Sequence, residues 1–369
     1  MAENQQKACP AKKTSIGGQA LIEGIMMRGP EVTSMAVRHV SGNIVLESWF
    51  TGGKKRAKFW TLPFVRGIFM LVDSLRYGYK CLMKSAELAG LEDEDGNETE
   101  EKRPLTQADV ERFRREAGKD VTVEVIGRVE DAPEGEKSEN DAVQGDAPAP
   151  PKEEKKSEKV LMSVLMGVSM LVGVVLAVGL FFFLPTVLFN LATSAAPSLH
   201  ENVYLRAVFE GLLRIVIFVA YLALVFQLKD IKRVFQYHGA EHKTIFCYEH
   251  GSELTVENVR VQRRFHPRCG TSFLILMLLV GILISMFIHV SNPFLRTLIK
   301  LLTFPLVAGV GYELIKLAGR KDNLLTRIIS APGMWLQRIT TREPDDGMIE
   351  CAIAAMKAVI PDDPEKDNW

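Results

Sequence analysis

The residues best suited to chemistry are two histidines and a glutamate in one short polar segment. His238, Glu241 and His242 occur within five residues, between hydrophobic runs. On a helix, His238 and His242 are four residues apart and share one face, with Glu241 three residues after His238. Two imidazoles placed in this way can bind one metal ion beside a carboxylate. The pattern H-x-x-E-H is the inverted zinc-protease signature, in which the histidines bind zinc and the glutamate is the general base.

A second polar cluster follows, with His266 and Cys269 as its metal-binding residue types. Zinc accepts both imidazole and thiolate ligands. We therefore predict a divalent metal, zinc, held by His238 and His242 with His266 or Cys269, and Glu241 as the catalytic base that activates water. In the alternative interpretation, the two histidines are ordinary polar residues of a helix next to a membrane.

Charged neighbours extend the predicted site. Arg268 and Lys243 are suited to holding an anionic group such as a phosphate or a carboxylate. The glycine-bounded segment 16–30 adds Glu23, as a further base or metal ligand, and Arg28, as a substrate-binding residue. The same segment is equally well interpreted as a half-buried strand bounded by turns.

Composition excludes some functions. The 369 residues have no formal net charge and are 47% hydrophobic. Without a surplus of basic residues, the chain does not resemble a general nucleic-acid binder. The five cysteines are odd in number and scattered, which favours a reducing compartment over a disulfide framework. The polar N-terminus does not resemble a secretory signal peptide.

The N-terminal part is predicted to hold a disordered leader (1–15), a small β unit (16–60) and an amphipathic helix (61–89). Within the β unit, residues 35–40 and 44–50 predict a hairpin with a glycine-containing turn. The apolar period of the helix, after a basic lead-in, suits a membrane surface, packing on membrane helices, or the core of a soluble domain.

Residues 90–158 are predicted to be an acidic, mostly disordered insertion, because they carry few aromatic and many charged residues. A weak helix over 106–117 and a weak strand over 121–129 interrupt it.

Residues 159–318 are predicted to form a membrane region, because their apolar runs are long enough to cross a roughly 30 Å hydrocarbon core. Four spans are expected, over residues 160–184, 205–228, 272–290 and 295–317. Lysine and arginine are concentrated before the first span, in the loop 229–271 and after the fourth span. By the positive-inside rule, this loop and both termini face the cytoplasm.

Ionisable residues inside the spans invite a functional interpretation. Arg206, Glu210 and Arg214 are spaced by four and share one helix face. They either line a polar cavity for a substrate or lie near the outer interface, where long side chains extend to water.

Residues 319–369 are predicted to form amphipathic helices at the membrane surface. Glu343, Asp345 and Glu350 are carboxylates that either converge on the histidine site or cap helices and pair with arginines.

Several motifs together resemble one known family, the YqhQ-like bacterial membrane proteins. This family has a domain of unknown function and is labelled a predicted metal-dependent enzyme. The similarity covers the chain except the leader and residues 90–158, and it implies a bacterial cytoplasmic (inner) membrane. The motifs are G-G-Q-A (17–20), E-G-I-M-M-R (23–28), H-G-A-E-H-K (238–243), H-P-R-C-G-T-S-F (266–273), T-R-E-P-D-D (341–346) and E-C-A-I-A-A (350–355).

The sequence therefore predicts a polytopic α-helical membrane protein of about four transmembrane helices, with a small cytoplasmic β unit and amphipathic juxtamembrane helices. One function is a metal-dependent hydrolase that works beside the lipid bilayer. The other is a non-catalytic scaffold, insertion or assembly factor, whose His/Cys cluster is structural and whose helices contact other membrane proteins. A transporter is less favoured, because the sequence shows no inverted repeat.

Overall fold

The computed structural model describes residues 13–52, 58–90, 105–118, 120–129, 152–194, 202–320 and 323–367. Most of the predicted leader and most of the predicted insertion lie outside these ranges. The chain divides into two compact units, each described by itself. The sheet unit comprises Met1–Asp131, Val219–Val280 and Phe304–Trp369, and the helical unit comprises Ala132–Phe218 and Gly281–Thr303.

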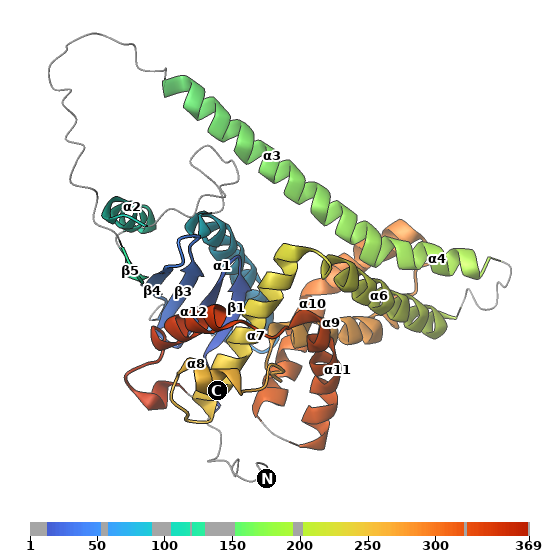
Figure 1. Cartoon of the computed structure of the whole chain (residues 1–369). Coiled ribbons are helices and arrows are strands. Elements are labelled where there is room, and N and C mark those ends of the chain that lie inside the picture. The colour runs from blue at the N-terminus through green and yellow to red at the C-terminus, as the bar shows by residue number, and fades with distance from the viewer. Residues whose placement is uncertain are drawn as a thin grey trace. The chain divides into compact units, whose positions relative to one another are not determined.

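The sheet unit contains an antiparallel sheet in which each strand pairs with the next along the chain (Figure 1). Its strands are β1 (Gly17–Leu21), β2 (Gly24–Arg28), β3 (Val32–Arg38), β4 (Ile44–Phe50) and β5 (Val121–Ile126). The predicted hairpin is confirmed as β3 and β4.

The weak strand over 121–129 and the weak helix over 106–117, predicted to interrupt the disordered insertion, are confirmed as β5 and the helix before it. β5 pairs with β4 from Trp49 to Ile44, and its Val123 side chain is buried. Helix α2 (Gln107–Ala117) precedes it, begins at a capping box on Thr106, and buries Phe113. This segment has few apolar residues, but it is ordered because β4 pairs with β5 and because Phe113 and Val123 join a buried cluster on the sheet.

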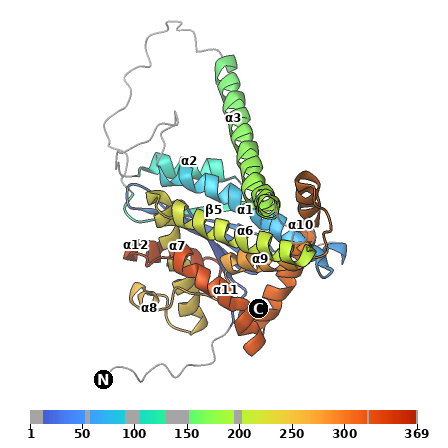
Figure 2. The ribbon, with the colours of Figure 1, turned by 90° about the vertical axis from the view of Figure 1, so that its right-hand side faces the viewer.

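Helices cover both faces of the sheet (Figure 2). Because side chains alternate along a strand, Ile25 and Met27 belong to one buried cluster and Met26 to the other. The first cluster includes residues of α7 (Lys229–Glu249), α8 (Val256–Arg260) and α12 (Asp346–Lys357). The second includes residues of α1 (Val65–Ala89) and α2.

Helix α1 packs against other helices as well as the sheet. Near its start, a Cβ on Gly67 would lie 3.0 Å from Gly309 Cα of helix α10 (Pro293–Arg320). Beside this contact Arg66 pairs with Glu313. Helix α1 therefore packs on the apolar helix α10 near its start and on the sheet near its end. Both kinds of packing were among the environments predicted for it.

Among the described residues, three helices are long and apolar enough to cross a membrane, and they indicate a membrane protein. They are Gly167–Ala192, Val203–Val225 and Pro293–Leu317. The first runs without interruption through α3 (Lys152–Val178), a π-helical turn (Gly179–Phe183) and α4 (Leu184–Ala192); the second is α6.

The third predicted span corresponds to a shorter helix, α9 (Gly270–Ser285), of 16 residues. At 1.5 Å per residue it is about 24 Å long, less than a roughly 30 Å core. A fourth crossing therefore stays a prediction. The remaining elements of the described chain are α11 (Leu324–Thr340) and the 3₁₀ turns Lys58–Thr61 and Pro364–Lys366.

Candidate metal site

Helix α7 and the residue before α9 bring three metal-binding side chains together. The His238 and His242 rings lie one turn apart on α7, with centroids 4.4 Å from each other. Cys269 immediately precedes α9, and its sulfur is 3.1 Å from His238 Nε2. One ligand atom from each of the three residues lies within 4.8 Å of the other two. Tetrahedral zinc would set these atoms about 3.3–3.6 Å apart, so small shifts suffice to bind it.

Backbone carbonyls orient both imidazoles. His238 Nδ1 lies 2.8 Å from the carbonyl oxygen of Thr340, and His242 Nδ1 lies 2.5 Å from that of Arg264. A carbonyl only accepts, so each Nδ1 carries the proton and donates it. His242 Nε2 is then left with its lone pair and has no partner in the described chain. His238 Nε2 faces the Cys269 sulfur, and although burial opposes it, this sulfur raises the pKa of His238 to about 9. A bound metal would replace the proton on His238 Nε2, and outer carbonyls orient metal-binding histidines in this way.

The Cys269 side chain has the character of a thiolate. Burial alone would raise the pKa of this thiol, but His238 and His242 beside it hold the pKa well below its ordinary value. The backbone N–H of Thr271 points to the sulfur from 3.4 Å, in the first turn of α9, where a helix favours negative charge. A thiolate is the form of cysteine that binds metals.

Two atoms beside this group are buried and have no hydrogen-bond partner in the described chain: Glu241 Oε2 and His242 Nε2. Burial raises the pKa of Glu241, against the lowering effect of both histidines and of the Gly18 N–H, which donates to this carboxylate. A buried carboxylate oxygen and an imidazole lone pair both without partners are costly. A divalent cation held by His238, His242 and Cys269 would use the lone pair of His242 Nε2 and place positive charge near Glu241, so the residues present fit a divalent metal.

Strand β1 approaches Glu241 so closely that Gly18 has no room for a side chain. A Cβ there would lie 2.9 Å from Glu241 Cδ and 2.8 Å from the Met26 carbonyl oxygen, whereas a Cβ on Gly17 would meet nothing within 4 Å. We expect Gly18→Ala to cost about 1–3 kcal/mol by overpacking and to weaken metal retention, whereas Gly17→Ala leaves both unchanged. Denaturant unfolding and metal titration check this pair, and equal behaviour of the two variants would contradict the close approach.

His266, the other predicted ligand, lies outside the group. Its ring is 5.7 Å from that of His242, its Nε2 is 3.5 Å from Glu249, and its Nδ1 accepts from the Arg268 N–H. Burial lowers the pKa of His266, although Glu249 opposes this. Gln337 of α11 donates to its carbonyl and accepts from its N–H. In the sequence, Gln337 appears only as a polar position on an amphipathic helix. Its two buried hydrogen bonds to the His266 backbone, three residues before Cys269, were not predicted.

Glu23, the second predicted catalytic residue, lies in the turn between β1 and β2, with φ of 49°. Its carboxylate pairs with Arg233 and accepts from the Tyr237 hydroxyl at 3.3 Å. It therefore fastens this turn to α7 and is not part of the metal-binding group.

Two of the predicted anion-binding residues are occupied by other contacts. Lys243 Nζ donates to the Arg260 carbonyl and pairs with Glu343, both at 2.8 Å. Arg268 pairs with Glu249 at the end of α7. Both cations connect the loop after α7 to its surroundings.

The other C-terminal carboxylates take the helix-capping and ion-pairing roles that the sequence left open. Asp345 caps α12 by accepting from the Met348 N–H, and Glu350 pairs with Arg38 of β3.

Arg28 lines a cavity of about 510 Å³ at the β1 edge of the sheet. Gly18, whose N–H reaches Glu241, and Gly270, which follows Cys269, line the same cavity. Arg28 is held there by Asp73 at 3.3 Å. A larger cavity of about 600 Å³ lies on the α1 side, and none of the predicted site residues is among those lining it.

Comparison with known proteins places the chain in a family without an established activity. Residues 62–362 match the model of the family described as "Protein of unknown function (DUF1385)", and the chain belongs to this family. The "Uncharacterized protein YqhQ" of Bacillus subtilis (strain 168) is 28% identical to it over 349 residues, which are 93% of this chain and 92% of that protein. No solved structure matches.

Proposed function

We propose that this protein is a metal-dependent hydrolase that works at a membrane surface. The observation that carries the proposal is a group of three ligands, His238, His242 and Cys269, beside a buried Glu241 oxygen without a partner. Catalytic zinc sites use three protein ligands and leave a fourth position open, whereas structural sites are closed by four. The exclusion of His266 from the group favours the open arrangement.

Zinc is the proposed metal, because imidazole and thiolate ligands favour it over magnesium or calcium. Once bound, it would polarise a substrate carbonyl or phosphoryl oxygen and make a water more acidic. Glu241 takes the proton from the attacking water, because its carboxylate is buried beside the two histidines and Cys269. The Thr340 and Arg264 carbonyls keep both imidazoles aligned during this transfer.

The substrate is proposed to enter the 510 Å³ cavity, with a negatively charged group near Arg28. Because Cys269 immediately precedes the apolar helix α9 and α7 starts four residues after α6, the site is close in sequence to helices of membrane character. We place it on the cytoplasmic side of a bacterial cytoplasmic membrane, with both termini on that side. The lysines and arginines of the loop 229–271 support this orientation.

Metal content tests the site directly. The detergent-purified full chain is expected to hold about one zinc per chain, and His242→Ala to lose it while keeping its helical circular dichroism. His250, an exposed histidine at the end of the same helix, gives a matched control, and His250→Ala should retain the metal.

Absence of metal from the unmodified chain, or full retention in His242→Ala, would overturn the metal proposal. Metal loss accompanied by unfolding of His242→Ala would instead favour the non-catalytic scaffold or assembly factor, in which the metal is structural.

A further inference from the structure

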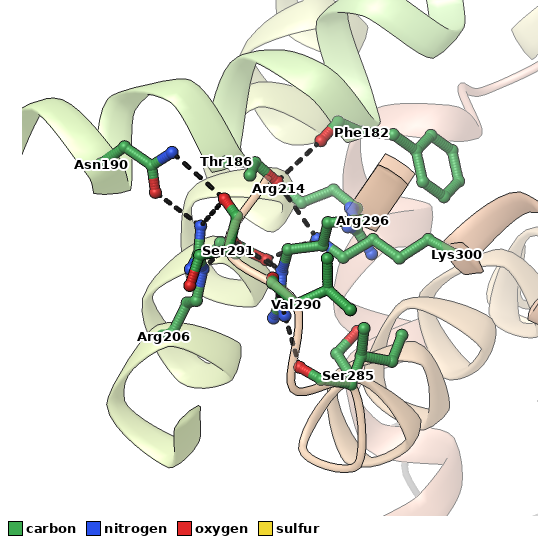
Figure 3. A network of polar contacts seen from close by, with 12 residues as sticks. Phe182, Thr186, Asn190, Arg206, Arg214, Ser285, Val290, Ser291, Arg296 and Lys300 are labelled. Carbon is green, nitrogen blue, oxygen red and sulfur yellow. Dashed lines mark hydrogen bonds and ion pairs between the residues drawn. The ribbon is translucent and has the colours of Figure 1, made fainter. Parts of the chain in front are cut away.

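The helical unit buries a group of charged side chains that the proposed hydrolase does not use (Figure 3). At its centre is Glu210 of α6, one of whose oxygens accepts from Arg206 Nε at 3.0 Å. Arg296 Nε of α10 lies 3.0 Å from both carboxylate oxygens, and Lys300 Nζ donates to one of them. A single carboxylate therefore faces three cations.

A fourth cation has no carboxylate in the described chain. Arg214, one α6 turn beyond Glu210, donates from Nε to the Phe181 carbonyl at 2.8 Å and lies over the Phe182 ring. Phe181 belongs to the π-helical turn, where the backbone pattern is shifted. All five charged residues are at most 6% exposed, so the group carries a formal excess of three positive charges away from water.

The same group of residues also contains buried donors without hydrogen-bond partners in the described chain. Arg296 donates from Nη1 to the Ile288 and Val290 carbonyls. Its Nη2, however, has no partner in the described chain, and neither does the hydroxyl of the adjacent Thr297. A guanidinium nitrogen and a hydroxyl are both donors that an oxyanion accepts from.

We propose that this cluster binds a phosphate group. Buried cations without counter-charges are costly, and these side chains are shielded from water by the protein around them. A phosphate offers several acceptor oxygens and negative charge, and arginine pairs with it in preferred geometry. The bound anion would balance Arg214 and Arg296, which Glu210 alone leaves in excess.

The chemistry fits two sources of phosphate. Arg206 and Arg296 are each three residues from the start of their helices, about 5 Å along the axis, near the depth of lipid headgroups. The exposed apolar residues of α6, such as Leu212 and Val216, give lipid access to the same helix. An anionic phospholipid and a free phosphate are therefore separate arms of the test.

The test measures thermal unfolding of the full chain in detergent, in phosphate and in chloride at equal ionic strength. Phosphate is expected to raise the midpoint by about 3 °C or more over chloride. In nanodiscs, phosphatidylglycerol should produce the same rise over phosphatidylcholine if lipid is the source. A rise in free phosphate alone, with no difference between the two lipids, assigns the soluble anion.

Arg214→Gln isolates the excess charge, because Arg214 forms no ion pair within the described chain. It should unfold about 2 °C or more higher than the unmodified chain in chloride, and it should lose most of the phosphate effect. Lys229→Gln removes one exposed charge outside the cluster and should change neither. Glu201→Gln, which removes the acidic residue just before α6, should likewise change neither.

A destabilised Arg214→Gln that keeps the full phosphate effect would overturn the proposal, as would no response of the unmodified chain to phosphate or to either lipid. A Glu201→Gln variant with an increased phosphate effect would also overturn it, by identifying Glu201 as the counter-charge.

Discussion

Glu241→Gln is expected to hold a full complement of metal and to hydrolyse substrate about 10²–10⁴-fold more slowly than the unmodified chain, the usual contribution of a general base. Glutamine keeps the shape of the side chain and the oxygen that accepts from the Gly18 N–H, but it cannot take a proton. His238, His242 and Cys269 are untouched by the change. Metal analysis and a screen of ester, phosphoester and peptide substrates measure the two effects separately.

The same variant has a second readout that needs no substrate. With metal removed by a chelator, Glu241→Gln should be at least as stable as the unmodified chain, because it replaces a buried carboxylate, one oxygen of which has no partner in the described chain, by a neutral amide. Glu257→Gln, on the exposed side of α8, is the matched control. Undiminished hydrolysis by Glu241→Gln would remove the base from the mechanism, and lost metal would make Glu241 a ligand.

Gly239→Ala is expected to be among the most damaging substitutions in the chain, with a loss of about 3 kcal/mol or more. A Cβ at this position would lie 1.9 Å from the Arg342 carbonyl oxygen. That oxygen belongs to the backbone segment whose Arg342 N–H donates to the Phe235 carbonyl of α7, so neither side can move alone. Shifting α7 would also withdraw His238 from the Thr340 carbonyl, and the variant should lose metal as well as stability.

The control for this variant is Gly270→Ala, at the first residue of α9, where a Cβ meets nothing within 4 Å. It should be neutral or stabilising by up to about 1 kcal/mol, because alanine is the better helix former. Denaturant unfolding with parallel metal analysis checks both variants. Equal stabilities would show that α7 does not pack against Arg342 at the distance described.

The spacing and types of residues close together in the sequence were sufficient to predict the cluster of His238, His242 and Cys269. Helical spacing put His238 and His242 on one face, and the residue types of the next polar cluster indicated Cys269 as a partner. The hairpin β3–β4 followed from its glycine-containing turn. These features depend on neighbours within a few residues, which the sequence displays directly.

Features that depend on distant partners could not be read in this way. In sequence, His266 resembles a metal ligand and Arg268 resembles an anion-binding residue. In the structure both contact Glu249, which nothing in their spacing indicates. The strand β5 was predicted from its local pattern, but its pairing with β4, about 70 residues earlier, was not. The predicted span 272–290 ends as a helix at Ser285, where the carbonyls that follow are taken by Arg296 from the next helix.

The contact of α12 with the sheet also sets an order of events during synthesis. The face of β2 and β3 that carries Ile25 and Ala36 is buried against α12, and about 300 residues separate the end of β4 from that helix. At 5–20 residues per second, a ribosome needs roughly 15–60 s to add them. During this time β2 and β3 lack their contact with α12, and their apolar face stays uncovered by that helix while the apolar helices between them are synthesised. Thr340, which orients His238, follows it by 102 residues, so a nascent chain completes the candidate site only after both segments have been made.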